Sequence, residues 1–184
     1  MKTLYATPVV VLLLCFPLSG YAQDSKITVP FDSLELTNVK ATGNIKTGVV
    51  EILMDFRNGY EKPSTVSLDF GGFDRFGITD AAGKKYKLFT NENLIGTSDV
   101  NKGYQPISYI RFGDKTQDWV TLVQQELQPG ETKTLTVRLE NVDREASTLK
   151  EIHGFCILAQ VIHIGDKSYR VENLDIKWTD SSGK

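Results

Sequence analysis

The side chains that most often carry out chemistry in enzymes are few and widely spaced in this sequence. Its histidines are His153 and His163, ten residues apart on or beside one predicted strand. At about 3.3 Å per residue this places them roughly 30 Å apart, too far to share a metal ion or a catalytic triad. The carboxylates Glu51 and Asp55 share one face of a strand, which is typical of a solvated face. We therefore expect no enzyme, and a hydrolase assembled from distant residues stays as the third alternative.

Metal and cofactor sites are not expected either. The sequence lacks the motifs G-x-S-x-G, H-E-x-x-H and C-x-x-C, and it has no phosphate-binding loop. Residues 99–103 resemble the opening of a calcium loop, but the glycine comes one position too early and no bidentate acid follows. Cys156 lies in an apolar run, which indicates a buried, inert thiol. No residue is assigned as catalytic, cofactor-binding or metal-ligating.

The more informative residues are aromatic side chains grouped with an arginine. Tyr104, Tyr109, Arg111 and Trp119 lie in and just after a long polar segment, 91–118. Exposed aromatic faces beside polar groups can bind sugars, and aromatic residues with arginine form the hot spots of protein interfaces. Alternatively, Tyr109 and Trp119 point into the core, and the alternation around Tyr109 leaves neither strand face wholly polar. These four residues are the candidate ligand-binding residues.

The elements that position these residues are mainly strands. Apolar residues occupy every second position in residues 49–56, 65–70 and 132–139, which is typical of half-buried antiparallel strands. Residues 155–164 are apolar on both faces and predict one strand in the middle of a sheet, followed by a turn at 164–167. Short strands, little helix and frequent turns predict an all-β fold, an immunoglobulin-like antiparallel two-sheet sandwich with at most one short helix.

Two segments depart from simple alternation. Residues 142–152 predict the short helix, because apolar residues recur there every three or four positions and Asp143 can cap the first turn. The recurring apolar residues are Val142, Ala146, Leu149 and Ile152. In the last strand the apolar positions change parity between Val171 and Leu174, which predicts a bulge near residues 172–173.

Three turn-containing segments carry a resemblance to known proteins. They are Phe56–Pro63 followed by 66–68, the hairpin 78–86, and Leu127–Glu131 followed by the strand 134–139. With them, residues 49–140 resemble a group of secreted bacterial immunoglobulin-like domains of mostly uncharacterised function. The resemblance implies an immunoglobulin-like sandwich and a role in interactions at or near the cell envelope. It implies no site residue, because the matching elements are structural turns.

The N-terminal residues predict where the protein works. Lys2 precedes the apolar run 9–14, and small residues lead to a cleavage position after Ala22, so residues 1–22 read as a cleaved signal peptide. The apolar run is too short for a permanent anchor, and we expect no membrane span in the mature form. The remaining residues, 23–184, have the size of a single domain.

Charge excludes one large class of partners. The mature chain has 20 basic and 23 acidic residues, a formal net charge of −3, and no cluster of lysine and arginine. Nucleic acid is therefore not an expected partner. We predict an exported, non-enzymatic protein, periplasmic or extracellular, that binds another envelope or extracellular protein. The alternative is a carbohydrate-binding module that uses the exposed aromatic residues to hold a glycan.

Overall fold

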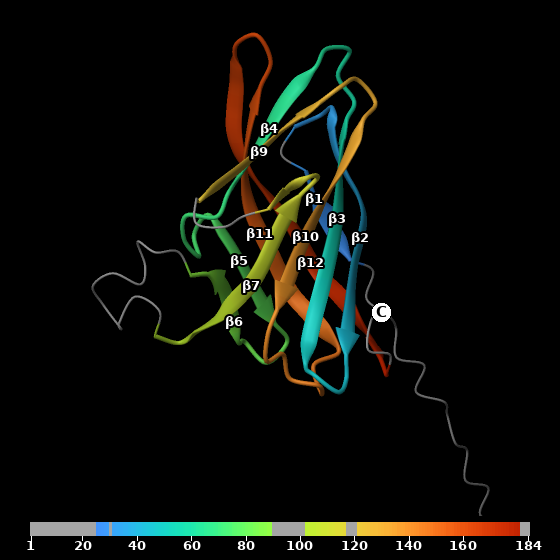
Figure 1. Cartoon of the computed structure of the whole chain (residues 1–184), viewed down its shortest axis with the longest axis vertical. Coiled ribbons are helices and arrows are strands. Elements are labelled where there is room, and N and C mark those ends of the chain that lie inside the picture. Colours follow the sequence, from blue (N-terminus) through green and yellow to red (C-terminus); the bar gives the residue numbers. More distant parts are fainter. Residues whose placement is uncertain (1–24, 30, 90–101, 117–120, 181–184) are drawn as a thin grey trace, which may run out of the picture.

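The computed structural model describes residues 25–29, 31–89, 102–116 and 121–180. The strands are β1 (Lys26–Thr28), β2 (Leu34–Asn44), β3 (Val49–Asn58), β4 (Ser64–Asp69), β5 (Phe76–Asp80), β6 (Lys85–Leu88), β7 (Tyr104–Phe112), β8 (Lys115–Thr116), β9 (Leu122–Leu127), β10 (Thr132–Leu139), β11 (Thr148–Ala159) and β12 (His163–Thr179). These ranges contain no helix (Figure 1), and so no helix there is long and apolar enough to cross a membrane. The predicted signal peptide, residues 1–22, lies outside the described residues.

The strands close into a barrel. Hydrogen-bonded neighbours follow in the order β12–β2–β3–β10–β7–β6–β5–β11, and β11 pairs again with β12, which completes a ring of eight strands. Strand β1 is added to β12, β8 to β7, and β4 with β9 to β11. The two-sheet sandwich predicted from the sequence is therefore wrong, whereas the all-β class is confirmed.

Two long strands account for the closure. One edge of β11 pairs with β12, while the other edge pairs with β5 at residues 149–154 and with β4 at 155–159. Strand β12 also pairs in parallel with β2, at residues 176–179, and β6 pairs in parallel with β7. Alternation along a strand determines which side chains face inward, but it does not specify which edges pair. The parallel closures therefore have no counterpart in the sequence pattern.

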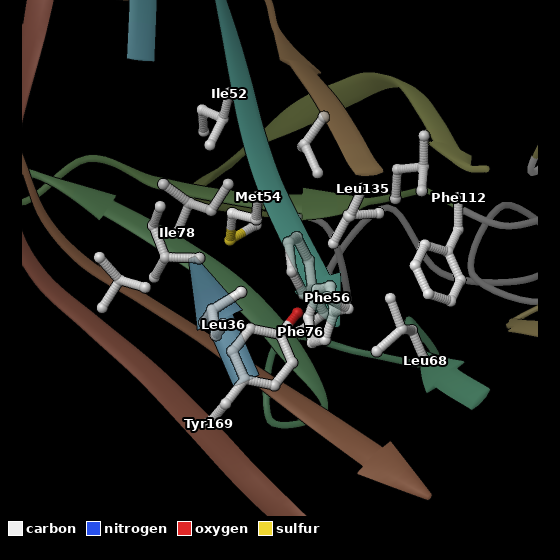
Figure 2. Packing of buried hydrophobic residues seen from close by; sticks show 14 of the residues in the cluster. Leu36, Ile52, Met54, Phe56, Leu68, Phe76, Ile78, Phe112, Leu135 and Tyr169 are labelled. Carbon is white, nitrogen blue, oxygen red and sulfur yellow. The ribbon is translucent and has the colours of Figure 1, made fainter. Parts of the chain in front are cut away.

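The inward positions predicted from the alternation fill the barrel. Those of β3 and β10 are all buried: Val50, Ile52, Met54, Phe56, Leu135, Val137 and Leu139. Figure 2 shows several of them packed together with Phe112 and Tyr169. The ring of Phe56 meets Phe112 and Tyr169 edge-on, with centroids 5.6 and 5.4 Å away. The barrel interior is thus a packed core.

The helix predicted over residues 142–152 is absent. Ala146 N donates to Asp143 O at 3.0 Å in a turn, and β11 begins at Thr148. The apolar residues there are buried, but the register of β11 against β5 shifts between Leu149 and Glu151. Because of this bulge, Leu149 and Ile152 both face the core from a strand, at the three-residue spacing that a helix would also produce.

The change of face predicted in the last strand is observed, but it is not the predicted bulge, because Glu172 and Leu174 pair with Glu151 and Leu149 of β11 without a register shift. Asn173 has a φ of 55°, in the left-handed region, between the buried side chains of Val171 and Leu174. The change of parity keeps a single inward face along β12.

The apolar run 155–164 is not one strand. Strand β11 ends at Ala159, and the chain turns with Gln160 N donating to Ile162 O at 2.9 Å before β12 begins. The turn predicted at 164–167 is therefore misplaced, because those residues lie in β12. The central position of β11 is confirmed, since it pairs with β12, β4 and β5.

Candidate functional site

Two of the predicted site residues, Tyr109 and Arg111, lie together on the outer face of β7. Alternation places them there, because Ile110 and Phe112 between and beside them point into the core. On the neighbouring strand, Arg138 is directly opposite Tyr109, and Thr136 is opposite Arg111. A second row of outward residues on β3 completes this side of the barrel.

An open hollow of about 620 Å³ lies on this face, and we name it the outer hollow. Strand β7 contributes Tyr109 and Arg111 to its lining, β3 contributes Glu51, and β10 contributes Arg138. Hydroxyl groups come from Thr132, Thr134 and Thr136 of β10. The lining is therefore rich in hydrogen-bond donors around one aromatic ring.

Arg138 organises one side of the outer hollow. Its Nη2 donates to Glu51 Oε2 at 3.1 Å, and its guanidinium lies 5.4 Å from the centre of the Tyr109 ring. Both members of the ion pair are more than two-fifths exposed, so the pair adds at most about 1 kcal/mol to stability. Its effect is to hold Arg138 against Tyr109, and the same pair borders a second hollow of about 430 Å³.

The carboxylates Glu51 and Asp55 on this face already have donors, whereas the guanidinium of Arg111 has no acceptor among the described residues. Glu51 accepts from Arg138, and Asp55 accepts from Thr134 Oγ1 at 2.6 Å and from Asn38 Nδ2 at 2.8 Å. Within the described part of the chain, the side chain of Arg111 makes no hydrogen bond or ion pair, and the residue is exposed. Its planar guanidinium is thus available to a partner that presents acceptors.

Of the other two predicted residues, Tyr104 is described and does not line this hollow. Tyr104 lies five residues from Tyr109, roughly 17 Å along β7. Its ring packs on Phe73 with 5.1 Å between centroids, and Lys87 Nζ lies 4.6 Å from its centre. Lys87 is buried there, and that burial lowers its pKa. Trp119 lies outside the described residues. Tyr104 and Tyr109 therefore do not form one aromatic platform.

The tip of the β11–β12 hairpin is a feature that the sequence interpretation missed. Val161 is 94% exposed and Ile162 is 74% exposed. The sequence signal for this exposed tip was the apolar run itself, because the run continues beyond Ala159, where β11 ends. Without the position of the turn, such a run is indistinguishable from a buried central strand.

In the described ranges, the two histidine positions and the cysteine are not brought together. His153 Nε2 lies against Phe73 O and its Nδ1 is 3.5 Å from Glu151 Oε1. His163 lies on the next strand, opposite Ala159, so the two histidine positions are roughly 20 Å apart rather than the predicted 30 Å. Cys156 is buried, and desolvation raises its pKa to about 12. Within the described ranges, no three His, Cys, Asp or Glu side chains are placed to hold a metal ion.

Comparison with known proteins yields similarities of fold alone. No family model and no curated protein matches the sequence. AggA, the major subunit of aggregative adherence fimbriae type I from Escherichia coli, aligns over 86% of this chain and 97% of its own, with 9% identity and a TM-score of 0.41. MyfA, the major subunit of Myf fimbriae from Yersinia enterocolitica, aligns over 79% and 98%, with 14% identity and a TM-score of 0.37. The periplasmic chaperone SfaE aligns over 82% of this chain and 57% of its own, with 10% identity and a TM-score of 0.31.

These similarities are too low to transfer any function. The similar structures include fimbrial subunits and a chaperone, while no family model confirms the resemblance to secreted immunoglobulin-like domains of uncharacterised function. The function of this chain is therefore argued below from its own residues.

Proposed function

We propose that this chain is an exported, non-enzymatic protein of the bacterial cell envelope, periplasmic or extracellular, that acts by binding another protein. The observation that carries the proposal is the side chain of Arg111, exposed and without an acceptor among the described residues, beside Tyr109 on the rim of the outer hollow. Tyrosine and arginine, with tryptophan, are the residues most enriched at the energetic centres of protein interfaces. A partner that offers carboxylates or carbonyl groups matches the donors of this face.

The environment of the tyrosine rings favours a protein over a glycan. Sugars stack on open aromatic faces, but Arg138 lies over the Tyr109 ring, and Lys87 with Phe73 lies against the Tyr104 ring. Two rings in separate surroundings offer no shared stacking surface. The carbohydrate-binding alternative has no observation of its own in its favour.

Export is part of the proposal and rests on residues 1–22. Their charge, apolar run and small residues match a cleaved signal, and the mature chain would then begin at Gln23 as a single domain. The mass of the protein isolated from the envelope fraction tests this. A mass that includes residues 1–22, or recovery from the cytoplasm, would contradict export.

Site-directed photo-crosslinking tests the binding surface. A photoreactive residue replaces Thr132 at the outer hollow, and a control chain carries it at exposed Gln124 on β9. We expect a discrete protein adduct from position 132 alone, weakened at least about tenfold by Arg111→Ala in the same chain. Equal adducts at both positions, or an adduct indifferent to Arg111→Ala, would exclude the outer hollow. Binding to a glycan array that depends on Tyr109 would instead favour the carbohydrate alternative.

A further inference from the structure

We infer that Asn58 and Gly59 form a modification site of the unfolded chain, at which the side-chain amide of Asn58 is lost, and that folding switches this reaction off. The site is separate from the outer hollow and does not depend on the function proposed for it. Asn58 is the last residue of β3, and no other asparagine in the sequence is followed by glycine. Glycine has no side chain to hinder an approach to its own nitrogen, whereas the other asparagines precede larger residues.

The reaction is intramolecular and consumes only water. The backbone nitrogen of Gly59 attacks Cγ of Asn58, the new N–Cγ bond closes a succinimide ring, and Nδ2 leaves as ammonia with the proton that the nitrogen gives up. Water then adds to one ring carbonyl and breaks its bond to nitrogen. Opening at Cγ leaves aspartate, and opening at the backbone carbonyl leaves isoaspartate, in which the main chain runs through the former side chain.

The folded chain holds every group of this reaction away from its partner. Gly59 N donates to Ser33 O at 2.7 Å, so the attacking nitrogen points at another strand. The Asn58 side chain is fully buried, its Oδ1 accepts from Tyr60 N at 3.0 Å, and its Nδ2 donates to two backbone carbonyls at 2.9 Å each. Gly59 itself is exposed, so these hydrogen bonds rather than exclusion of water prevent ring closure. The reaction therefore requires the chain to open.

The fold also requires the glycine that makes this asparagine reactive. A Cβ at position 59 would lie 2.9 Å from Ser33 O and 3.4 Å from Glu35 Oε1. The first of these atoms belongs to the backbone, so it cannot swing aside as the end of a flexible side chain would. A larger residue at position 59 would slow the reaction but strain the contact with the segment that begins β2.

Isoaspartate at position 58 is incompatible with the contacts made there. It adds a methylene group to the main chain between positions 58 and 59. In the folded chain Asn58 N donates to Glu131 O at 2.9 Å, Gly130 N donates to Asn58 O at 2.7 Å, and the next nitrogen donates to Ser33 O. A lengthened main chain cannot keep all three of these bonds. A chain that stays unfolded long enough is therefore modified irreversibly and loses the ability to complete this turn.

The test compares the folded and unfolded states of the full chain. Purified protein is held at neutral pH in buffer and, in parallel, in urea above its unfolding transition. Mass spectrometry and chromatography of the peptide that contains Asn58 then measure aspartate and isoaspartate. We expect conversion at least about 1,000-fold faster in urea, because conversion in buffer requires an unfolding event. In urea Asn58 should also convert before Asn38, which precedes the β-branched Val39.

Ala82→Asn is the matched control, because it places the same dipeptide in the exposed turn between β5 and β6, before Gly83. We expect position 82 to convert in the folded chain at a rate within about tenfold of its rate in urea, since an exposed turn opens at little cost. After urea is removed, chains with isoaspartate at position 58 should stay unfolded. Chains converted at position 82 alone should refold.

Three results would overturn the inference. Equal conversion of Asn58 in buffer and in urea would show that its contacts do not protect it. Equal protection of positions 58 and 82 in buffer would assign the slow rate to the solvent rather than to those contacts. Full refolding of chains that carry isoaspartate at position 58 would show that the turn tolerates the longer main chain.

Discussion

The side-chain amide of Asn58 donates to the carbonyl oxygen of Leu127 at 2.9 Å, across 69 positions of sequence. The same Nδ2 donates to Lys62 O at 2.9 Å, and Oδ1 accepts from Tyr60 N at 3.0 Å. The backbone of Asn58 also exchanges two hydrogen bonds with residues 130–131. Two turns that carried the family resemblance, 56–63 and 127–131, are thus fastened to each other by one buried asparagine.

Replacing this asparagine should therefore be costly. Asn58→Asp keeps the shape but removes both amide donors, leaving the carbonyls of Lys62 and Leu127 beside a buried carboxylate. We expect the free energy of unfolding to fall by about 2–4 kcal/mol, measured by urea denaturation at pH 7. Gln124→Glu, the same amide-to-acid change at an exposed position, is the control and should stay within about 0.5 kcal/mol. Equal effects of the two changes would show that the fastening contributes little.

Two buried tyrosines should respond in opposite ways to loss of the hydroxyl. Among the described residues, the hydroxyl of Tyr169 is buried without a hydrogen-bond partner, and Figure 2 shows it pointing into the apolar cluster. Tyr86, in contrast, donates to Asp80 Oδ2 at 3.0 Å. We expect Tyr169→Phe to leave the free energy of unfolding unchanged or to raise it by about 1 kcal/mol, and Tyr86→Phe to lower it by about 1–3 kcal/mol. Thermal unfolding of both variants tests this, and a marked loss in Tyr169→Phe would reveal a hidden partner.

Gly154 should not tolerate a side chain while Tyr169 is present. A methyl group at position 154 would fall within the ring atoms of Tyr169, which is buried and has no room to move. We expect Gly154→Ala to lower the free energy of unfolding by about 1–3 kcal/mol. Tyr169→Leu removes the distal ring atoms, so the double variant should lose less than the sum of the single variants, with a coupling of about 0.5–3 kcal/mol. Additive losses would disprove the close contact.

The buried thiol of Cys156 should make stability depend on alkaline pH. Burial raises its pKa from 9.0 to about 12, so the folded state holds the proton over a range in which the unfolded state releases it. The unfolded state then binds fewer protons, and the free energy of unfolding falls as pH rises from about 9 to about 12. We expect Cys156→Val to lose less stability than the natural protein between pH 8 and pH 10.5, measured by urea midpoints. A larger loss in the variant would reverse the sign and contradict the assignment.

The faces of the strands could be predicted from the sequence, but their partners could not. Residues such as Ile52, Met54 and Val137 follow the alternation, because water drives every second side chain inward regardless of the neighbouring strand. Edge pairing depends on backbone groups that every residue carries, so the parallel pair of β12 with β2 leaves no mark in the side-chain pattern. The predicted sandwich and the observed barrel differ in which strand edges pair with each other.

The errors at the predicted helix and at the apolar run 155–164 also have a local physical cause. The bulge between Leu149 and Glu151 gives the apolar residues the spacing expected of a helix. Val161 and Ile162 are exposed, but as apolar residues they extend the pattern expected of a buried strand. For the candidate site, Tyr109 and Arg111 could be named from residue type, whereas Arg138 and Glu51 become relevant only through the cross-strand register. Residue chemistry was readable in the sequence, and proximity between strands was not.

The parallel pair of β12 with β2 has a consequence for how the protein matures. It joins Ala41–Asn44 to Ile176–Thr179, nearly the full described length of the chain apart. A polypeptide that emerges N-terminus first cannot complete the ring until residue 179 is free, and pairings of such long sequence separation form slowly. The unclosed chain therefore persists throughout synthesis, and this is the state in which the proposed export would thread it through a secretion channel.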